Sequence, residues 1–238
     1  LDLAERWLLR ILRTMRQEIR AGMPFVVLEP SCCAVFRDEL TNLFPNNEDA
    51  RRLKAQTFLL SEFLQQHAPD FQIPHLGKKA LVHGHCHHKA IMGLTDEEKL
   101  LERLGLTVEV PESGCCGMAG AFGFERGEHY DVSIACGERV LLPAVRAADD
   151  DALIIANGFS CREQISQTTD REALHLAQVL RMALQQDDST SIAGRPESGL
   201  IRARRQELRG ANRRAMLVLA GGAATAMTYR VWRRNHGH

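Results

Sequence analysis

Four short segments typical of β-strands are each followed within a few residues by cysteine, and this pattern constrains the fold more than any other feature. The segments are residues 25–28, 80–83, 107–110 and 153–156, and predicted helices separate them. Short, mostly apolar runs that alternate with helices are typical of strands buried on both faces of a parallel sheet. The sequence therefore predicts an α/β fold, an open and mostly parallel sheet with helices on both faces.

The first and fourth segments look like copies of one unit. Each runs into a short turn, a Ser-Cys pair and a helix, with Ser31-Cys32 in the first copy and Ser160-Cys161 in the fourth. We therefore expect pseudo-repeated halves, of which the first is truncated. Long helices are expected over 47–67 and 127–147. Thr95 and Glu98 have the spacing of a capping box at the start of another helix.

The charges are unevenly distributed along the chain. Of the 30 Lys+Arg and 30 Asp+Glu, ten Arg but only two Glu fall in residues 195–238. Such a split is typical of a folded body joined to a basic tail. We expect a body over 1–184, a polar linker containing Gly and Pro over 185–199, and a helical or disordered tail over 200–238.

The tail contains an uncharged run of 15 residues, Ala215–Tyr229. This run is shorter than the about 20 residues that a helix needs to span a bilayer. The Arg residues beside it predict no more than weak contact with anionic lipid, and a helix docked on a partner is the alternative. Aromatic residues are not interleaved with the Arg cluster, which argues against nucleic acid as a partner.

The chain has seven cysteines, and an odd number does not suit a framework of paired disulfides. The carboxyl ends of parallel strands share one edge of a sheet, so the cysteines that follow the strands should converge there. They are Cys32, Cys86, Cys115, Cys116 and Cys161. The helices that start at these loops would favour thiolate over thiol. Four or five converging thiolates are what an iron–sulfur cluster requires.

Glycine and histidine accompany these cysteines. Gly114 and Gly117 flank the adjacent cysteine pair, where backbone without a Cβ could approach inorganic sulfide closely. His85 and His87 lie on either side of Cys86. We assign these two glycines and two histidines to cofactor binding.

The two remaining cysteines are assigned no ligand role. We expect Cys33 to be a neighbour of the site, because the fourth-segment copy has Arg162 at that position. Cys136 lies inside the predicted helix over 127–147 and is expected in the core. Zinc is the competing metal because of the histidines beside Cys86, but zinc sites usually draw on C-x-x-C pairs, which the chain lacks. A thiol–disulfide enzyme is disfavoured on the same ground.

The combined motifs resemble a known family. The segments that carry the resemblance are residues 28–32, 85–89, 114–120 and 158–164. They resemble the CCG-type cysteine-rich domain found at the C-terminal, iron–sulfur end of FAD-linked D-2-hydroxy acid dehydrogenases, which act on D-lactate, D-2-hydroxyglutarate or glycolate. The resemblance covers about residues 1–184.

This resemblance implies an electron-transfer function. A cluster of the 4Fe-4S type, held by four of the five cysteines, would pass electrons from flavin to an acceptor such as a membrane quinone. The FAD-binding dehydrogenase domain would lie upstream in the same polypeptide, so the chain alone would not oxidise a hydroxy acid. Labile thiolates point to the cytoplasm, with peripheral contact at the inner membrane face through the tail.

One position departs from the family pattern. The fullest form of the motif ends in C-x-x-C, but Gly158 stands three residues before Cys161. Cys32 could supply the ligand that is absent there. Two alternatives stay open: a catalytic cysteine or cluster site like that of heterodisulfide reductases, and a zinc-stabilised binding module.

Overall fold

The computed structural model describes residues 2–185, 194–199, 201–202, 206–207 and 209–210. The chain divides into two compact units, Leu1–Arg195 and Pro196–His238. The named helices and strands all belong to the first unit. The apolar run of the predicted tail lies outside the described residues. No helix in the described part of the chain combines the length and apolarity needed to cross a bilayer.

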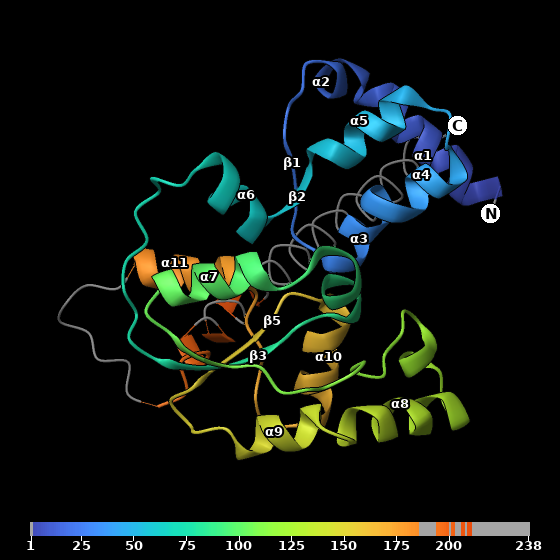
Figure 1. Ribbon diagram of the computed structural model, residues 1–238. Coiled ribbons are helices and arrows are strands. Elements are labelled where there is room, and N and C mark those ends of the chain that lie inside the picture. Colours follow the sequence, from blue (N-terminus) through green and yellow to red (C-terminus); the bar gives the residue numbers. More distant parts are fainter. Residues whose placement is uncertain (1, 186–193, 200, 203–205, 208, 211–238) are drawn as a thin grey trace, which may run out of the picture. The chain divides into compact units, whose positions relative to one another are not determined.

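Helices and short strands alternate through the first unit (Figure 1). The strands are β1 (Phe25–Val27), β2 (Thr57–Leu59), β3 (Lys79–His83), β4 (Thr107–Glu109) and β5 (Leu153–Ala156). The helices before β3 are α1 (Asp2–Thr14), α2 (Arg16–Arg20), α3 (Pro30–Ala34), η1 (Val35–Glu39), α4 (Leu40–Leu43), α5 (Glu48–Gln56) and α6 (Leu60–His67). Those after β3 are η2 (His88–Met92), α7 (Thr95–Arg103), η3 (Phe122–Phe124), α8 (Glu128–Glu138), α9 (Leu141–Ala147), α10 (Phe159–Thr168) and α11 (Leu176–Leu184).

All strand pairs are parallel, as predicted, and the strands divide into two sheets. β1 pairs with β2, with Phe25 opposite Thr57. The second sheet has the order β4-β3-β5, in which Ala80 of β3 lies opposite Val108 on one side and Leu153 on the other. The loops after β3, β4 and β5 therefore leave the same edge of one sheet.

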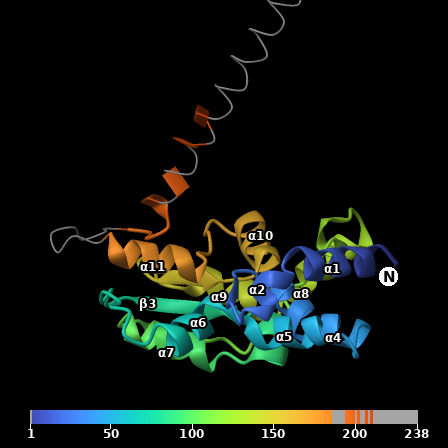
Figure 2. The ribbon, with the colours of Figure 1, turned by 90° about the horizontal axis from the view of Figure 1, so that it is seen from above.

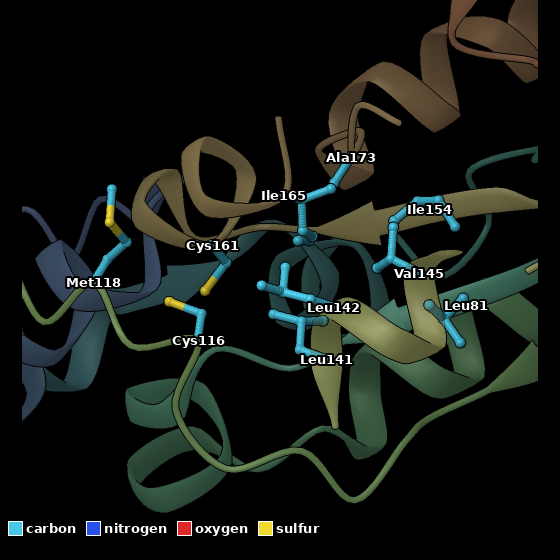
Figure 3. Close-up of a cluster of buried hydrophobic side chains, with 11 residues drawn as sticks. Leu81, Cys116, Met118, Leu141, Leu142, Val145, Ile154, Cys161, Ile165 and Ala173 are labelled. Carbon is cyan, nitrogen blue, oxygen red and sulfur yellow. The ribbon is translucent and has the colours of Figure 1, made fainter. Parts of the chain in front are cut away.

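Helices cover both faces of the three-stranded sheet, which confirms the predicted layering. On one face, Leu81 and Ile154 pack in a buried cluster with Leu142 of α9 and Ile165 of α10 (Figure 3). Side chains alternate along a strand, so the neighbouring buried residues of β3 and β5 face the other way. In Figure 1, α7 and α11 lie on the opposite side of these strands from α9. Figure 2 shows the same elements from above.

The two sheets share a local design that supports the expected pseudo-repeat. β1 and β5 each lead into a helix that carries Ser-Cys. β1 pairs with β2, and β5 makes an equivalent parallel bridge through Ile155 to Leu174. The helix that follows each partner starts alike, because Leu59 N–H donates to Glu62 Oε2 at 2.7 Å and His175 N–H donates to Gln178 Oε1 at 2.8 Å.

Three helix predictions were wrong in detail. The helix expected over 47–67 is interrupted by β2, whose Thr-Phe-Leu sequence favours a strand and pairs with β1. The helix over 127–147 breaks between α8 and α9, where Pro143 lacks the N–H that a continuous helix would need. Thr95 is not a capping residue, because Leu94 is the N-cap and no side chain caps α7.

The packing against the strands gives a stability prediction. Leu142 is fully buried in the cluster of Figure 3, so Leu142→Ala should lower the free energy of unfolding by about 3 kcal/mol. Val132 on α8 is 44% exposed, and Val132→Ala should change it by less than about 0.5 kcal/mol. Urea unfolding of the metal-free chain, followed by circular dichroism, measures both. Equal losses in the two variants would contradict this packing.

Candidate metal centre

Four cysteines lie on the loops after β3, β4 and β5. Cys86 follows β3, the pair Cys115 and Cys116 follows β4, and Cys161 lies in the first turn of α10 after β5. Three separate loops thus deliver thiols to one edge of the sheet. Cys116 and Cys161 are 3% and 1% exposed, so the site extends from the surface into the core.

These four thiols act on one another electrostatically. The sulfurs of Cys116 and Cys161 are turned toward each other at the end of the apolar cluster (Figure 3), and the two side chains share a hydrogen bond. The charges of Cys86 and Cys115 also act on Cys161. The structure therefore brings together four of the five predicted ligands.

The thiols do not titrate as the sequence predicted. The hydrogen bond from Cys161 lowers the pKa of Cys116 well below its ordinary value, and the same bond raises the pKa of Cys161 well above it. Burial raises the pKa of Cys115 and of Cys32. The expectation that helix N-termini would favour thiolate throughout is wrong, because burial outweighs the helix dipole and the single favoured thiolate depends on a neighbouring thiol.

Backbone packing fixes the Cys115-Cys116 pair. Gly117 N–H donates to Cys115 Sγ at 3.3 Å. A Cβ on Gly117 would lie 2.0 Å from the carbonyl oxygen of Ser133, and its φ of +101° also favours glycine. Gln164 of α10 donates from Nε2 to the carbonyl oxygen of Cys116 at 3.0 Å. Gly114 lies in open space, so sterics do not require glycine there.

Lys89 and His83 link the loop after β3 to the loop after β4. Lys89 Nζ donates to the carbonyl oxygens of Ser113 and Gly114, immediately before the cysteine pair. His83, at the end of β3, shares a hydrogen bond of 2.8 Å between its Nδ1 and Ser113 Oγ. These contacts hold Cys86 in register with Cys115 and Cys116.

A buried carboxyl links the loop after β3 to the loop after β5. Glu97 of α7 is 3% exposed, and its Oε2 accepts from Asn157 Nδ2 at 2.7 Å and lies 3.3 Å from His88 Nδ1. Asn157 precedes the α10 turn that carries Cys161, and His88 follows Cys86 by two residues. Burial raises the pKa of Glu97 to about 7 and lowers that of His88 to about 4.

Cys32 has a different environment from the other four. The interactions described for it are with Glu29 and Cys33 of its own loop. Glu29 nevertheless ties this loop to α10, because Phe159 N–H donates to Glu29 Oε2 at 3.4 Å. His175 adds a second tie, 2.7 Å from its Nε2 to the carbonyl oxygen of Leu28. The structure thus places the Cys32 loop beside the site but does not join its sulfur to the others.

The other two cysteines lie apart from this group. Cys33 is fully buried, and burial raises the pKa of its thiol to about 11. Arg37, next to it, forms an ion pair with Glu62 at 2.5 Å. Cys136 lies on α8 and is only half-buried, so the expectation that it is a core residue was wrong.

Sequence reasoning missed several residues that support the site. Glu97 stands in an acidic first turn of α7 and looked like a solvated charge, and nothing local indicated its burial. Asn157 and Ser113 were within the motifs but carried no assigned role. His83 could have been found from its place at the last position of a strand that leads to cysteine.

Two buried nitrogens show that the site suits a sulfur-rich group. His83 Nε2 and His87 Nδ1 are buried and have no hydrogen-bond partner among the described residues. Buried polar atoms are rarely left unpaired, so these nitrogens indicate a missing partner. Within the described residues, no three His, Cys, Asp or Glu side chains are already gathered around a single metal ion. Four converging thiols with unpaired nitrogens beside them fit the donor set of an iron–sulfur cluster.

Comparisons with known proteins show similarity to parts of oxidoreductases. The chain is 29% identical over 161 residues to D-2-hydroxyglutarate dehydrogenase of Pseudomonas putida, covering 67% of this chain and 15% of that protein. It is 26% identical over 167 residues to one subunit of the anaerobic glycerol-3-phosphate dehydrogenase of Escherichia coli, covering 68% and 41%. It is 28% identical over 186 residues to lactate utilization protein A of Bacillus licheniformis, covering 71% and 75%.

The extent of these matches differs. The chain spans only a small part of the dehydrogenase of Pseudomonas putida, less than half of the glycerol-3-phosphate dehydrogenase subunit, and about three quarters of lactate utilization protein A. No family model matches the chain. No solved structure matches it either.

The buried Glu97 predicts a pH dependence of stability. Its pKa is raised in the folded chain, so the folded state binds this proton more tightly and stability is lost as the pH rises from about 4.5 to about 7. Between about pH 5.5 and pH 8 this loss amounts to about 2 kcal/mol. The Glu97→Gln variant should lack it, so its free energy of unfolding relative to the original chain should rise by that amount.

Urea unfolding of both chains at the two pH values measures this difference. His88 titrates in the opposite direction, with stability lost below about pH 6.5, and both chains retain it. The exposed Glu102 on the same helix provides a control, since Glu102→Gln should show the same pH profile as the original chain. A constant difference between Glu97→Gln and the original chain would refute a buried carboxyl.

Proposed function

We propose that this chain is an iron–sulfur electron-transfer domain that works with an FAD-linked 2-hydroxy acid dehydrogenase. The observation that carries the proposal is the convergence of four thiols, from three loops, at the carboxyl edge of one parallel sheet. Such a set of soft sulfur donors suits iron–sulfur clusters. We assign four of Cys32, Cys86, Cys115, Cys116 and Cys161 as ligands, with the last four the set that the geometry favours.

The relatives support the proposed partner chemistry. Their names refer to D-2-hydroxyglutarate, glycerol 3-phosphate and lactate, and two of these are 2-hydroxy acids. The chain matches only 15% of the first relative, so most of such a protein lies outside the matching region. We therefore place FAD and substrate oxidation in an upstream part of the same polypeptide and electron relay in this chain. An electron acceptor such as a membrane quinone belongs to the same proposal.

The residues around the site have distinct tasks in this function. The four thiols would hold a cluster of the 4Fe-4S type, which supplies one-electron transfer when bound. Lys89 places a positive charge beside a group that carries several thiolates, and that charge offsets their mutual repulsion. The apolar cluster behind Cys116 and Cys161 excludes water from the inner side of the site.

The organisation of the whole chain follows from this proposal. We assign residues 1–184 to the iron–sulfur domain, 185–199 to a linker and 200–238 to a basic tail. Reduced thiols favour the cytoplasm. The Arg residues of the tail would allow weak contact with the inner membrane face, as a peripheral attachment.

Anaerobic reconstitution with iron and sulfide tests the proposal. The original chain should turn brown, bind iron and sulfide in equal amounts, and give an electron paramagnetic resonance signal in one redox state. Cys116→Ser and Cys161→Ser should each lose most of the iron. Cys136→Ser, outside the group, should bind as much iron as the original chain.

Other outcomes would reject the proposal or favour another function. A colourless protein that takes up only zinc would indicate a zinc-stabilised binding module. A spectrum that changes when a disulfide substrate is added would favour a catalytic site like that of heterodisulfide reductases. Turnover of a 2-hydroxy acid by the chain alone would contradict the assignment of oxidation to an upstream part.

The Lys89 contact makes a second prediction about the cluster. Lys89→Met removes the donor that holds Ser113 and Gly114, and loss of such supporting contacts typically weakens metal binding by about 10- to 100-fold. Competition with an iron chelator measures this loss. Lys99→Met, at an exposed position on α7, should behave like the original chain. Equal chelator resistance in both variants would show that Lys89 does not support the site.

A further inference from the structure

The space for a side chain at position 158 is filled by His85. A Cβ built on Gly158 would lie 2.4 Å from Cδ2 and 3.1 Å from Cγ of the His85 ring. The same Cβ would lie 3.2 Å from Cys161 Sγ, so a side chain here would point into the thiol site. A contact of 2.4 Å is far inside van der Waals distance, so a side chain at 158 and the observed His85 ring exclude each other.

The backbone gives no other reason for glycine at this position. Gly158 is the N-cap of α10 with φ −68° and ψ 130°, an extended conformation that any residue adopts. Several glycines of this chain have positive φ, but Gly158 is not among them. Its lack of a Cβ therefore serves the ring of His85.

The His85 ring is held in a defined orientation and tautomer. It is 7% exposed, and its Nδ1 accepts from the backbone N–H of His87 at 3.2 Å. A neutral imidazole that accepts at Nδ1 carries its proton on Nε2. Burial lowers the pKa of His85, which keeps the ring neutral near pH 7. Nε2–H is therefore a free donor on the ring edge that includes Cδ2.

The ring also lies among the cysteines. Its Nδ1 is 3.9 Å from Cys86 Sγ, and the charges of Cys116 and Glu29 act on it. His85 thus lies beside thiols from all three loops, with Cys161 reached across Gly158. Cys32, by contrast, shows described interactions only within its own loop.

We propose that His85 takes the place of a side chain at position 158 and donates its Nε2–H to a sulfur of the bound cluster. In this assignment His85, rather than Cys32, compensates for the missing cysteine of the C-x-x-C pattern. The proposal rests on the proposed function for the identity of the bound group. The exclusion between His85 and a side chain at 158 does not depend on it.

A double-mutant cycle in the metal-free chain tests the exclusion. Gly158→Ala should lower the urea midpoint markedly in the original background but by less than half as much in the His85→Ala background, where the ring no longer occupies the space. Gly114→Ala, where a Cβ would meet nothing within 4 Å, controls for the general effect of alanine on stability. Equal effects of Gly158→Ala in both backgrounds would overturn the exclusion.

Spectroscopy of the reconstituted chain tests the hydrogen bond. His85→Ala should shift the midpoint potential to a more negative value and alter the g-values, because a donor to cluster sulfur stabilises the reduced, more negative state. His85→Gln, whose amide N–H can occupy the Nε2 position, should restore much of the original potential, whereas His85→Asn should not. Unchanged potential and g-values in His85→Ala would overturn this part.

The two proposals can fail separately. If the original chain binds no iron while the stability cycle shows coupling, the proposed function fails and the exclusion stands. If iron binds normally and the His85 variants match the original chain in potential, the proposed function stands and the role of His85 is refuted.

Discussion

The shared carboxyl edge of parallel strands is the constraint on which the site depends. β3 pairs in parallel with both β4 and β5, so three loops must leave the sheet on the same side. Cysteines separated by up to 75 positions, from Cys86 to Cys161, come together for this reason alone. An antiparallel strand at either position would send its loop, and its cysteine, to the opposite edge.

Buried polar contacts then set the loops relative to one another. Lys89 ties the first cysteine loop to the second, and Glu97 ties it to the third through Asn157. A buried carboxyl with a raised pKa costs stability at neutral pH, and the fold retains it at the junction of two loops that carry ligands. The loop after β3 is therefore the centre of the arrangement, because both ties start from it.

Much of this could be predicted from the sequence, because the decisive features are local. Apolar segments followed by cysteine indicate parallel strands and a common edge, and the Ser-Cys pairs of residues 31–32 and 160–161 indicate the repeat. Long-range effects could not be predicted. The Glu97 carboxyl looks like any acidic helix start, and the thiolate character of Cys116 depends on Cys161, 45 positions away. Position 158 showed that a cysteine was absent, but only the structure shows that His85 fills its space.

The central claim is that the converging thiols hold iron and sulfide together. Iron K-edge X-ray absorption of the anaerobically reconstituted chain tests it most directly, because it reports the atoms around the metal without any assumption about activity. The account predicts a first shell dominated by sulfur and a second shell that contains iron, and it predicts loss of the iron shell in Cys116→Ser. A first shell of nitrogen and oxygen with no neighbouring iron would contradict it.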